Sequence, residues 1–109
     1  MGDVRDRLAL ALDMDDLDDA LRLARRVREW FGVAKIGLEL FTAHGPAAVV
    51  ALDAEGYRVF LDLKLHDIPT TVGRAARVIG SMGVAYTTVH TAGGDAMLRA
   101  AVEGMAAGA

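Results

Sequence analysis

Short apolar runs alternate with amphipathic segments four times along this chain. The apolar runs cover residues 8–12, 33–37, 57–63 and 84–89, and each is typical of a strand. Each run is followed by a segment whose apolar residues recur with the 3.6-residue period of a helix. Four consecutive strand–helix units predict a parallel sheet with right-handed crossovers.

Residues that start or end helices set the expected boundaries. The first helix carries aspartates in its first turn and arginines further on, as the helix dipole favours, and Gly32 is expected to end it. Pro46 and Pro69 begin the second and third helices, Gly56 and Gly83 follow them, and Asp95 is expected to cap the fourth.

The same pattern predicts what is buried. We expect the first strand to be buried on both faces, and Trp30 and Phe31 to pack between helix and sheet. The helix faces expected in the core are formed by Leu17, Ala20, Leu21, Ala24, Val27, Phe31, Val72, Ala75, Ala76, Ile79, Met82, Leu98, Ala101, Val102 and Met105.

The spacing between successive strand ends is regular. Asp13 and Lys35 are 22 residues apart, Lys35 and Asp62 are 27 apart, and Asp62 and His90 are 28 apart. Eight units of this length give a (β/α)8 TIM barrel of about 250 residues or fewer. We therefore predict that residues 1–109 form its first four βα units, without an internal domain boundary. Such a half barrel is incomplete unless it pairs with another copy or a missing half.

Composition excludes several classes of protein. Hydrophobic residues make up 53% and charged residues 25%, and the net charge of −3 argues against a nucleic-acid partner. The chain has no cysteine, which excludes disulfides, thiolate zinc sites and cysteine nucleophiles. The charged N-terminus lacks a signal-peptide core and no run is long enough to span a membrane, so we expect a cytoplasmic protein.

The basic residues are distributed unevenly. Arginine occurs ten times, whereas lysine occurs only at Lys35 and Lys64. A guanidinium does not readily release a proton, whereas a buried ammonium can. The two lysines are therefore candidates for proton chemistry, with chance in a lysine-poor chain as the alternative.

Ionisable residues collect at the predicted strand ends. Asp13, Lys35, Asp62, Lys64 and His90 lie at or just beyond the carboxyl ends of the four strands, where barrel active sites lie. Strand alternation predicts that Asp62 and Lys64 point the same way. The alternative is a buried ion pair that only stabilises the strand.

The segment 62–71 is the densest in polar residues. Lys64 lies between Asp62 and Asp67, and nearby carboxylates favour a protonated ammonium while desolvation opposes it. A charged ammonium in a partly closed site can deliver a proton to a carbanion. Pro69 restricts Ile68 to an extended conformation, which directs Asp67 away from its own strand.

Four segments together resemble the orotidine 5′-phosphate decarboxylases. They are Leu12-Asp13, the Lys35–Phe41 run KIGLELF, residues 62–71 and the Thr88–Gly94 run TVHTAGG. The resemblance follows the order and spacing of the family but covers about the first half of such an enzyme. It implies a homodimeric (β/α)8 barrel that converts orotidine 5′-monophosphate to uridine 5′-monophosphate and carbon dioxide, without a metal or organic cofactor.

The resemblance also implies roles for individual residues. Lys64 would protonate the C6 carbanion, and Asp62 would lie beside the substrate carboxylate. Lys35 would bridge this network and contact the ribose, and Asp13 would hydrogen-bond the ribosyl or base region.

A second group of residues is implied to act across the dimer. Asp67, accompanied by Ile68 and Thr71, would reach the partner's site. Thr70 stands where many relatives have asparagine. The phosphate-gripping loop and terminal arginine of the family come from later strands, so residues 1–109 alone are expected to be inactive or nearly so.

Three other functions remain open. Magnesium-dependent sugar-phosphate decarboxylases and aldolases share the Asp-x-Lys-x-x-Asp motif, but they carry a metal-binding carboxylate where Lys35 stands. A phosphorelay receiver fits Asp13, Asp15, Asp62 and Thr88 but lacks its fifth-strand lysine. A non-catalytic half-barrel association module shares every feature of the sequence.

Some polar segments have two interpretations. The run from Asp13 to Asp16 suggests a metal site, although helix capping explains most of it. His66 and His90 are candidate ligands or proton shuttles, but strand-end hydrogen bonds are the simpler expectation. Gly93-Gly94 could cradle a phosphate at a helix N-terminus or simply form a flexible loop.

Overall fold

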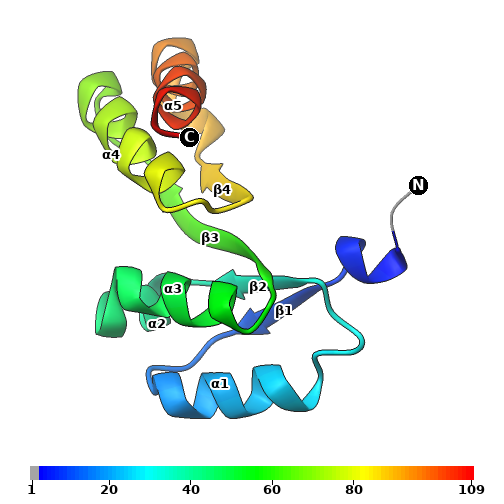
Figure 1. The fold of residues 1–109 in the computed structure, drawn as a ribbon. Coiled ribbons are helices and arrows are strands. Elements are labelled where there is room, and N and C mark those ends of the chain that lie inside the picture. Colours follow the sequence, from blue (N-terminus) through cyan, green and yellow to red (C-terminus); the bar gives the residue numbers. More distant parts are fainter. Residues whose placement is uncertain (1–2) are drawn as a thin grey trace. The chain divides into compact units, whose positions relative to one another are not determined.

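The computed structural model describes residues 3–109. The chain forms two compact units, and the boundary between them lies within the third strand. One compact unit ends at Asp62, and the second is Leu63–Ala109. The elements, shown in Figure 1, are η1 (Val4–Arg7), β1 (Ala9–Leu12), α1 (Leu17–Arg26), β2 (Val33–Ile36), α2 (Leu38–His44), α3 (Pro46–Ala54), β3 (Arg58–Leu65), α4 (Pro69–Ser81), β4 (Tyr86–Val89), η2 (Thr91–Gly93) and α5 (Asp95–Gly108).

The sheet follows the order of the chain, β1-β2-β3-β4. The pairing of β1 with β2 and of β2 with β3 is parallel, with Leu12 opposite Ile36 and Ile36 opposite Leu61. This in-register pairing aligns the last residues of β1 and β2 with Leu61 of β3. The predicted four strand–helix units and their parallel sheet are confirmed.

The first unit is packed by large apolar side chains. Those that are fully or almost fully buried are Leu12, Ile36, Leu40, Leu52, Tyr57 and Leu61. The Tyr57 hydroxyl donates a hydrogen bond of 2.7 Å to the Ala24 carbonyl, so its polar atom is satisfied inside the core. Burial raises the pKa of Tyr57 above its ordinary value.

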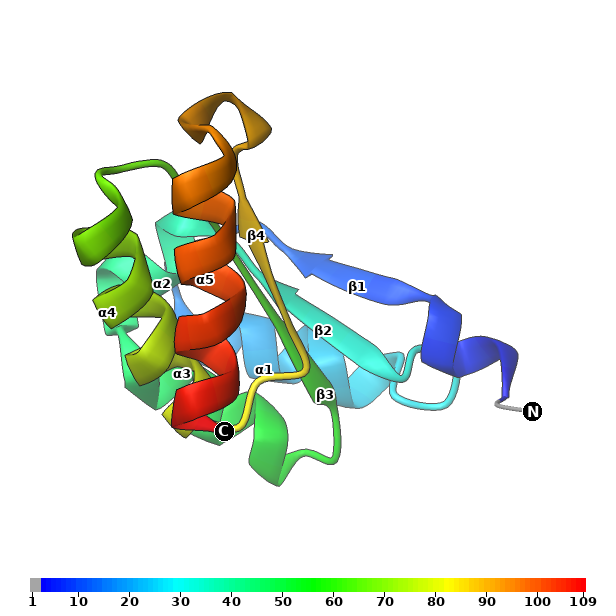
Figure 2. The same ribbon diagram turned by 90° about the horizontal axis from the view of Figure 1, so that it is seen from above.

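The second unit is packed through small residues. Helices α4 and α5 lie side by side in both Figure 1 and Figure 2. A Cβ atom on Gly104 would collide with the Gly73 carbonyl, and one on Gly108 would collide with the Arg77 carbonyl. A small core of Val72, Met97 and Ala101 lies beneath, surrounded by Leu65, Val89 and Leu98.

The expectation that the first strand is buried on both faces is wrong. Only Leu12 of β1 is buried, while Ala9 and Ala11 are exposed. β1 lies at the edge of the sheet, and the described residues do not cover all of its apolar side chains.

The first helix ends earlier than Gly32. It stops at Arg26, and residues 27–30 form a turn. Within this turn, the Arg28 side chain donates hydrogen bonds to the carbonyls of Glu55 and Gly56. The turn leaves Trp30 55% exposed, so its predicted packing is wrong. Phe31 is half-buried.

Helix α2 was not predicted from the sequence. It starts at Leu38 directly after β2, with Gly37 as its N-cap residue and no side-chain capping bond. Gly45, at φ 62°, separates it from α3. A single glycine at each end gave too weak a boundary signal to distinguish this helix from a loop.

In the third and fourth strand–helix units, several element boundaries and the buried face of the last helix differ from expectation. Strand β3 extends to Leu65, β4 begins only at Tyr86, and Gly94 rather than Asp95 is the N-cap residue of α5. Met97 and Ala101 form the buried face of α5, whereas Val102 is 71% exposed. Each residue turns a helix by about 100°, so Val102 lies one step beyond the buried stripe.

Most other helix positions follow the prediction. Ala20, Ala24, Val72, Ala76 and Ile79 are buried. The remaining ones are partly buried, namely Leu17, Leu21, Val27, Ala75, Met82, Leu98 and Met105. Among residues 3–109, none of the helices combines the length and apolar character needed to cross a bilayer.

Candidate functional site

In the first unit, Lys35 of β2 and Asp62 of β3 form an ion pair. The Lys35 Nζ lies 3.5 Å from Asp62 Oδ2, and the two side chains are 26% and 9% exposed. Lys35 is held in β2 between Ala34 and Ile36, which are both fully buried. A carboxylate this deeply buried needs a compensating cation, which the Lys35 ammonium supplies.

Asp13 lies in the same unit. It follows β1 directly, and its Oδ1 lies 3.4 Å from the point where a Cβ on Gly37 would be. The pairing of Leu12 with Ile36 explains this, because Asp13 and Gly37 are the next residues of the two strands. Asp13 therefore directly follows β1, Lys35 is the next-to-last residue of β2, and Asp62 lies within β3, directly after the residues that pair with β2.

The acidic run after β1 starts a helix. Asp16 is the N-cap residue of α1, and its carboxylate accepts a hydrogen bond of 3.1 Å from the Asp19 amide. The ring of His44 accepts a further 3.3 Å hydrogen bond from the Leu17 amide. Helix capping thus accounts for Asp16, as predicted. Within residues 3–109, no three histidine, aspartate or glutamate side chains are grouped closely enough to hold a metal ion.

In the second unit, Lys64 has an unusual backbone conformation. Among residues 3–109 it is the one non-glycine residue with φ in the left-handed region, at 50°. Its amide donates a hydrogen bond of 3.0 Å to Thr88 Oγ1. A non-glycine residue in this conformation costs about 1–3 kcal/mol and is found preferentially at functional sites.

This conformation changes one premise of the sequence interpretation. The expectation that Asp62 and Lys64 point the same way requires extended backbone at both residues. Lys64 is not extended, so strand alternation does not apply at this residue. Burial along β3 also fails to alternate, since Leu61 and Asp62 are both buried while Lys64 is exposed.

The turn after β3 has the predicted shape. Ile68 is extended, with φ −62° and ψ 151°, and Pro69 begins α4. Asp67 Oδ1 accepts a hydrogen bond of 2.7 Å from the Ile68 amide, and Thr71 is exposed in the first turn of α4. A hollow of about 490 Å³ is lined by His66, Asp67, Ile68, Pro69, Ala92 and Gly93.

The two strand-end histidines contact each other. The rings of His66 and His90 stack with their centroids 5.0 Å apart and an interplanar angle of 24°. The His90 backbone amide also donates a hydrogen bond of 2.9 Å to the Leu65 carbonyl. The stack and the backbone bond together join the turn after β3 to the turn after β4.

Gly94 has a conformational role. Its φ of 89° is one that side-chain-bearing residues rarely adopt, and it is the N-cap residue of α5. A Cβ on Gly93 would collide with the Met97 side chain. The backbone conformation therefore explains why glycine stands at position 94, and the close packing against Met97 explains it at position 93.

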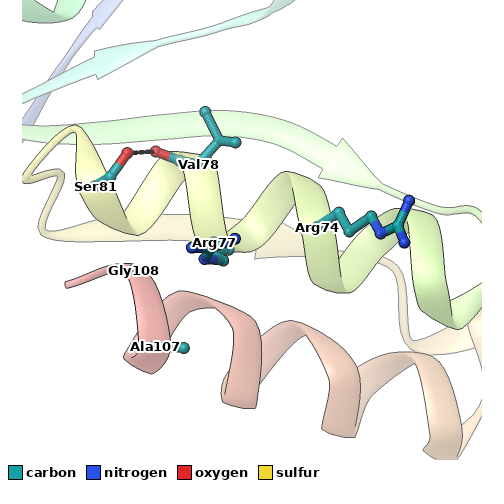
Figure 3. A pocket seen from close by; sticks show the side chains of 6 residues that line it. All are labelled: Arg74, Arg77, Val78, Ser81, Ala107 and Gly108. Carbon is teal, nitrogen blue, oxygen red and sulfur yellow. Dashed lines mark hydrogen bonds between the residues drawn. The ribbon is translucent and has the colours of Figure 1, made fainter.

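Sequence reasoning missed two features of the second unit. The contact of Thr88 with Lys64 was not predicted, because Thr88 was considered only for the phosphorelay alternative and as part of the Thr88–Gly94 run. A second hollow, of about 670 Å³, lies between α4 and α5 and is lined by Arg74, Arg77, Val78, Ser81, Ala107 and Gly108 (Figure 3). Arginine is the common basic residue of this chain, so nothing in the sequence distinguished Arg74 and Arg77 from the other arginines.

The predicted site residues thus fall into two groups. The first unit contains Asp13, Lys35 and Asp62, of which Lys35 and Asp62 are in contact. The second unit contains Lys64, Asp67, Ile68 and Thr71, all on β3, the following turn or the start of α4.

Comparison with known proteins identifies the family. The model of the orotidine 5′-phosphate decarboxylase / HUMPS family matches residues 6–109. Orotidine 5′-phosphate decarboxylases from Lactiplantibacillus plantarum and Heliobacterium modesticaldum are 52% and 47% identical to this chain. Each alignment covers 94% of the chain, but only 44% and 42% of those proteins.

Solved structures agree with this. The orotidine 5′-phosphate decarboxylase of Lactobacillus acidophilus matches with a TM-score of 0.82 and 36% identity, over 93% of this chain and 46% of that one. An uncharacterized conserved protein from Geobacillus kaustophilus matches with a TM-score of 0.87 and 42% identity, over 93% and 47%.

The chain spans less than half the length of these relatives. Its strand order and its alternation of strands and helices are those of half a (β/α)8 barrel, as predicted. With a family match over almost all of its residues, the chain belongs to the orotidine 5′-phosphate decarboxylase / HUMPS family.

Proposed function

We propose that the protein to which residues 1–109 contribute the N-terminal half of the barrel decarboxylates orotidine 5′-monophosphate to uridine 5′-monophosphate and carbon dioxide. The observation that carries this proposal is the buried Asp62 carboxylate paired with Lys35, within the motif that resembles the family. Identity of about half to the decarboxylases of two bacteria supports it.

The reaction needs a proton donor and a fixed positive charge. The bond between C6 of the pyrimidine and its carboxylate breaks, carbon dioxide leaves, and the electron pair stays on C6. The Lys64 ammonium then donates a proton to C6 and becomes a neutral amine, which is reprotonated from solvent. A cation fixed near C6 also stabilises the charge that builds up there without reorganisation.

The first unit supplies the rest of the proposed network. Asp62 lies beside the carboxylate that leaves, and Lys35 neutralises Asp62 while contacting the ribose. The 3.5 Å separation of Lys35 Nζ and Asp62 Oδ2 is the contact that joins the two residues of this network. The exposed carboxylate of Asp13 accepts hydrogen bonds from the ribosyl or base region.

A homodimer completes the proposed site. Asp67, Ile68 and Thr71 are all exposed on the segment that the family uses across its dimer, and Ile68 is 65% exposed. We propose that these residues reach the partner's site, and that the protein acts in the cytoplasm without a metal or organic cofactor.

The rival reaction is that of magnesium-dependent sugar-phosphate enzymes. Its metal site needs a carboxylate where β2 carries Lys35. An ammonium that already neutralises Asp62 repels a divalent cation from the same carboxylate. We therefore favour the metal-free decarboxylation.

The test is an assay of orotidine 5′-monophosphate decarboxylation with the full-length protein. We expect Lys64→Ala to lower kcat by roughly 10²–10⁴-fold or more, as loss of a general acid does. Arg99→Ala, an exposed position on α5, is the control and should retain activity. Undiminished turnover in Lys64→Ala contradicts the proposal, and a requirement for magnesium favours the rival. Residues 1–109 alone should show almost no activity, because the phosphate-binding residues of the family come from later strands.

A further inference from the structure

Lys64 has a backbone conformation that residues with a side chain rarely adopt. Lysine has a Cβ atom, so its left-handed conformation at φ 50° is unfavourable unless the surroundings stabilise it. The residue before it, Leu63, and the residue after it, Leu65, are both assigned to β3. The irregular conformation is therefore confined to one residue within the strand.

Thr88 provides a specific contact at this point. The Lys64 amide donates its 3.0 Å hydrogen bond to the Thr88 hydroxyl oxygen, a side-chain acceptor on β4. One residue later in β3, the Leu65 carbonyl accepts a hydrogen bond of 2.9 Å from the His90 amide. The hydroxyl thus provides an acceptor where the strand departs from regular geometry, as at the bulges found beside active sites.

Thr88 is suited to hold a fixed position. It is half-buried within β4, and its branched Cβ restricts rotation about χ1. The stacked rings of His66 and His90 brace the turns that follow the same two strands. The position of the Thr88 hydroxyl oxygen is therefore fixed by the β4 backbone, because the short, branched side chain has little freedom to move.

We propose that Thr88 is a positioning residue for Lys64, holding the lysine's backbone in its left-handed conformation and so fixing the direction in which the ammonium is presented. The catalytic part of this inference rests on the proposed function. Thr88 itself does not touch the reacting atoms. Misplacing a catalytic group by about 1 Å lowers turnover by about 10²-fold, so loss of the hydroxyl acts on the chemical step.

The experiment uses the full-length protein and three substitutions. Thr88→Val keeps the shape but removes the acceptor, Thr88→Ala removes it with a smaller side chain, and Thr88→Ser keeps it. Two readouts are followed: hydrogen exchange of the Lys64 amide in ¹⁵N-lysine-labelled protein, and steady-state decarboxylation of orotidine 5′-monophosphate.

We expect the valine and alanine variants to exchange the Lys64 amide about tenfold faster or more, as loss of a hydrogen bond implies. Their kcat should fall roughly 10–100-fold while KM stays within about twofold. The serine variant should restore both values to near those of the wild type. Recovery by serine separates the hydroxyl from a general packing effect.

Unchanged amide exchange in Thr88→Val and Thr88→Ala overturns the inference. Faster exchange with unchanged kcat also overturns it, because positioning would then have no consequence for the reaction. Failure of the proposed function looks different. In that case the wild type does not decarboxylate the substrate, yet faster Lys64 exchange in the valine variant and its reversal by serine still support the backbone contact.

Discussion

The two units of the chain are packed in opposite ways. The first buries large apolar side chains such as Leu52 and Leu61 between helices and strands. The second brings the backbones of α4 and α5 so close that glycine is needed where they meet, as at Gly104 and Gly108. The first unit is therefore packed mainly by large side chains, whereas the contact of α4 with α5 in the second requires small residues.

The same contrast extends to the two lysines. Lys35 lies in β2 and forms an ion pair with a carboxylate in the first unit. Lys64 has a left-handed backbone whose amide is bound by a side chain in the second. Lys35 is positioned by its ion pair and by regular strand geometry, whereas Lys64 lies where the strand departs locally from that geometry. Substitutions should therefore have different effects in the two units.

The largest expected effect is in the core of the first unit. Leu52→Ala should lower the free energy of unfolding of the full-length protein by about 2–5 kcal/mol, because Leu52 is fully buried and its removal leaves a cavity. Val50→Ala on the same helix is the control, since Val50 is 68% exposed, and should change stability by about 0.5 kcal/mol or less. Urea unfolding measures both, and equal effects would contradict the assigned core.

The second unit should respond to an added methyl group. Gly104→Ala should cost about 1–3 kcal/mol of unfolding free energy, because the new Cβ collides with the Gly73 carbonyl. Gly73→Ala is the matched control, since its Cβ would lie 3.5 Å from the Ala100 side chain, an ordinary contact. The control should be neutral or up to about 1 kcal/mol more stable through helix propensity. Losses of equal size in the two variants would disprove the close helix contact.

The two lysines should show opposite preferences between glycine and alanine. Lys64→Gly should be about 1 kcal/mol more stable than Lys64→Ala, because glycine adopts the left-handed conformation without strain. At Lys35, in a regular strand, the glycine variant should be less stable by about 0.5–1 kcal/mol. Thermal or urea unfolding of the four full-length variants measures the two differences. The same sign at both positions would contradict the strained backbone of Lys64.

The sequence was informative wherever local pattern decides the structure. Hydrophobic periodicity identified all four strand–helix units, and their spacing identified half a barrel. The carboxyl ends of parallel strands share one edge, so strand order predicted that the charged residues near those ends converge, and Lys35 and Asp62 are in contact.

Features that depend on distant neighbours were not predictable in this way. The left-handed backbone of Lys64, whose amide binds a hydroxyl from β4, corresponds to no pattern within 62–71. The exposure of Ala9 and Ala11 depends on what covers the edge of the sheet rather than on the apolar run itself. The register of α5 followed from a glycine N-cap at Gly94, one residue before the expected aspartate.

The smallest effect concerns the surface of the first unit. Arg25 donates a hydrogen bond of 2.8 Å to Glu55 Oε1, and this bond is the main reason that the pKa of Glu55 lies below its ordinary value. Since the lowered pKa belongs to the folded state, the pair stabilises the protein above the ordinary pKa of about 4.5, and this contribution disappears as pH falls through the lowered value.

Arg25→Gln should therefore be slightly less stable than the wild type at neutral pH, and the difference should vanish in acid. Arg26→Gln is the charge-matched control on α1, because its guanidinium forms no ion pair within residues 3–109. Urea unfolding of the full-length protein between pH 3 and pH 7 follows the difference. A difference that grows as pH falls would contradict the pairing. The dependence on pH matters more than its size, because exposed pairs contribute little on their own.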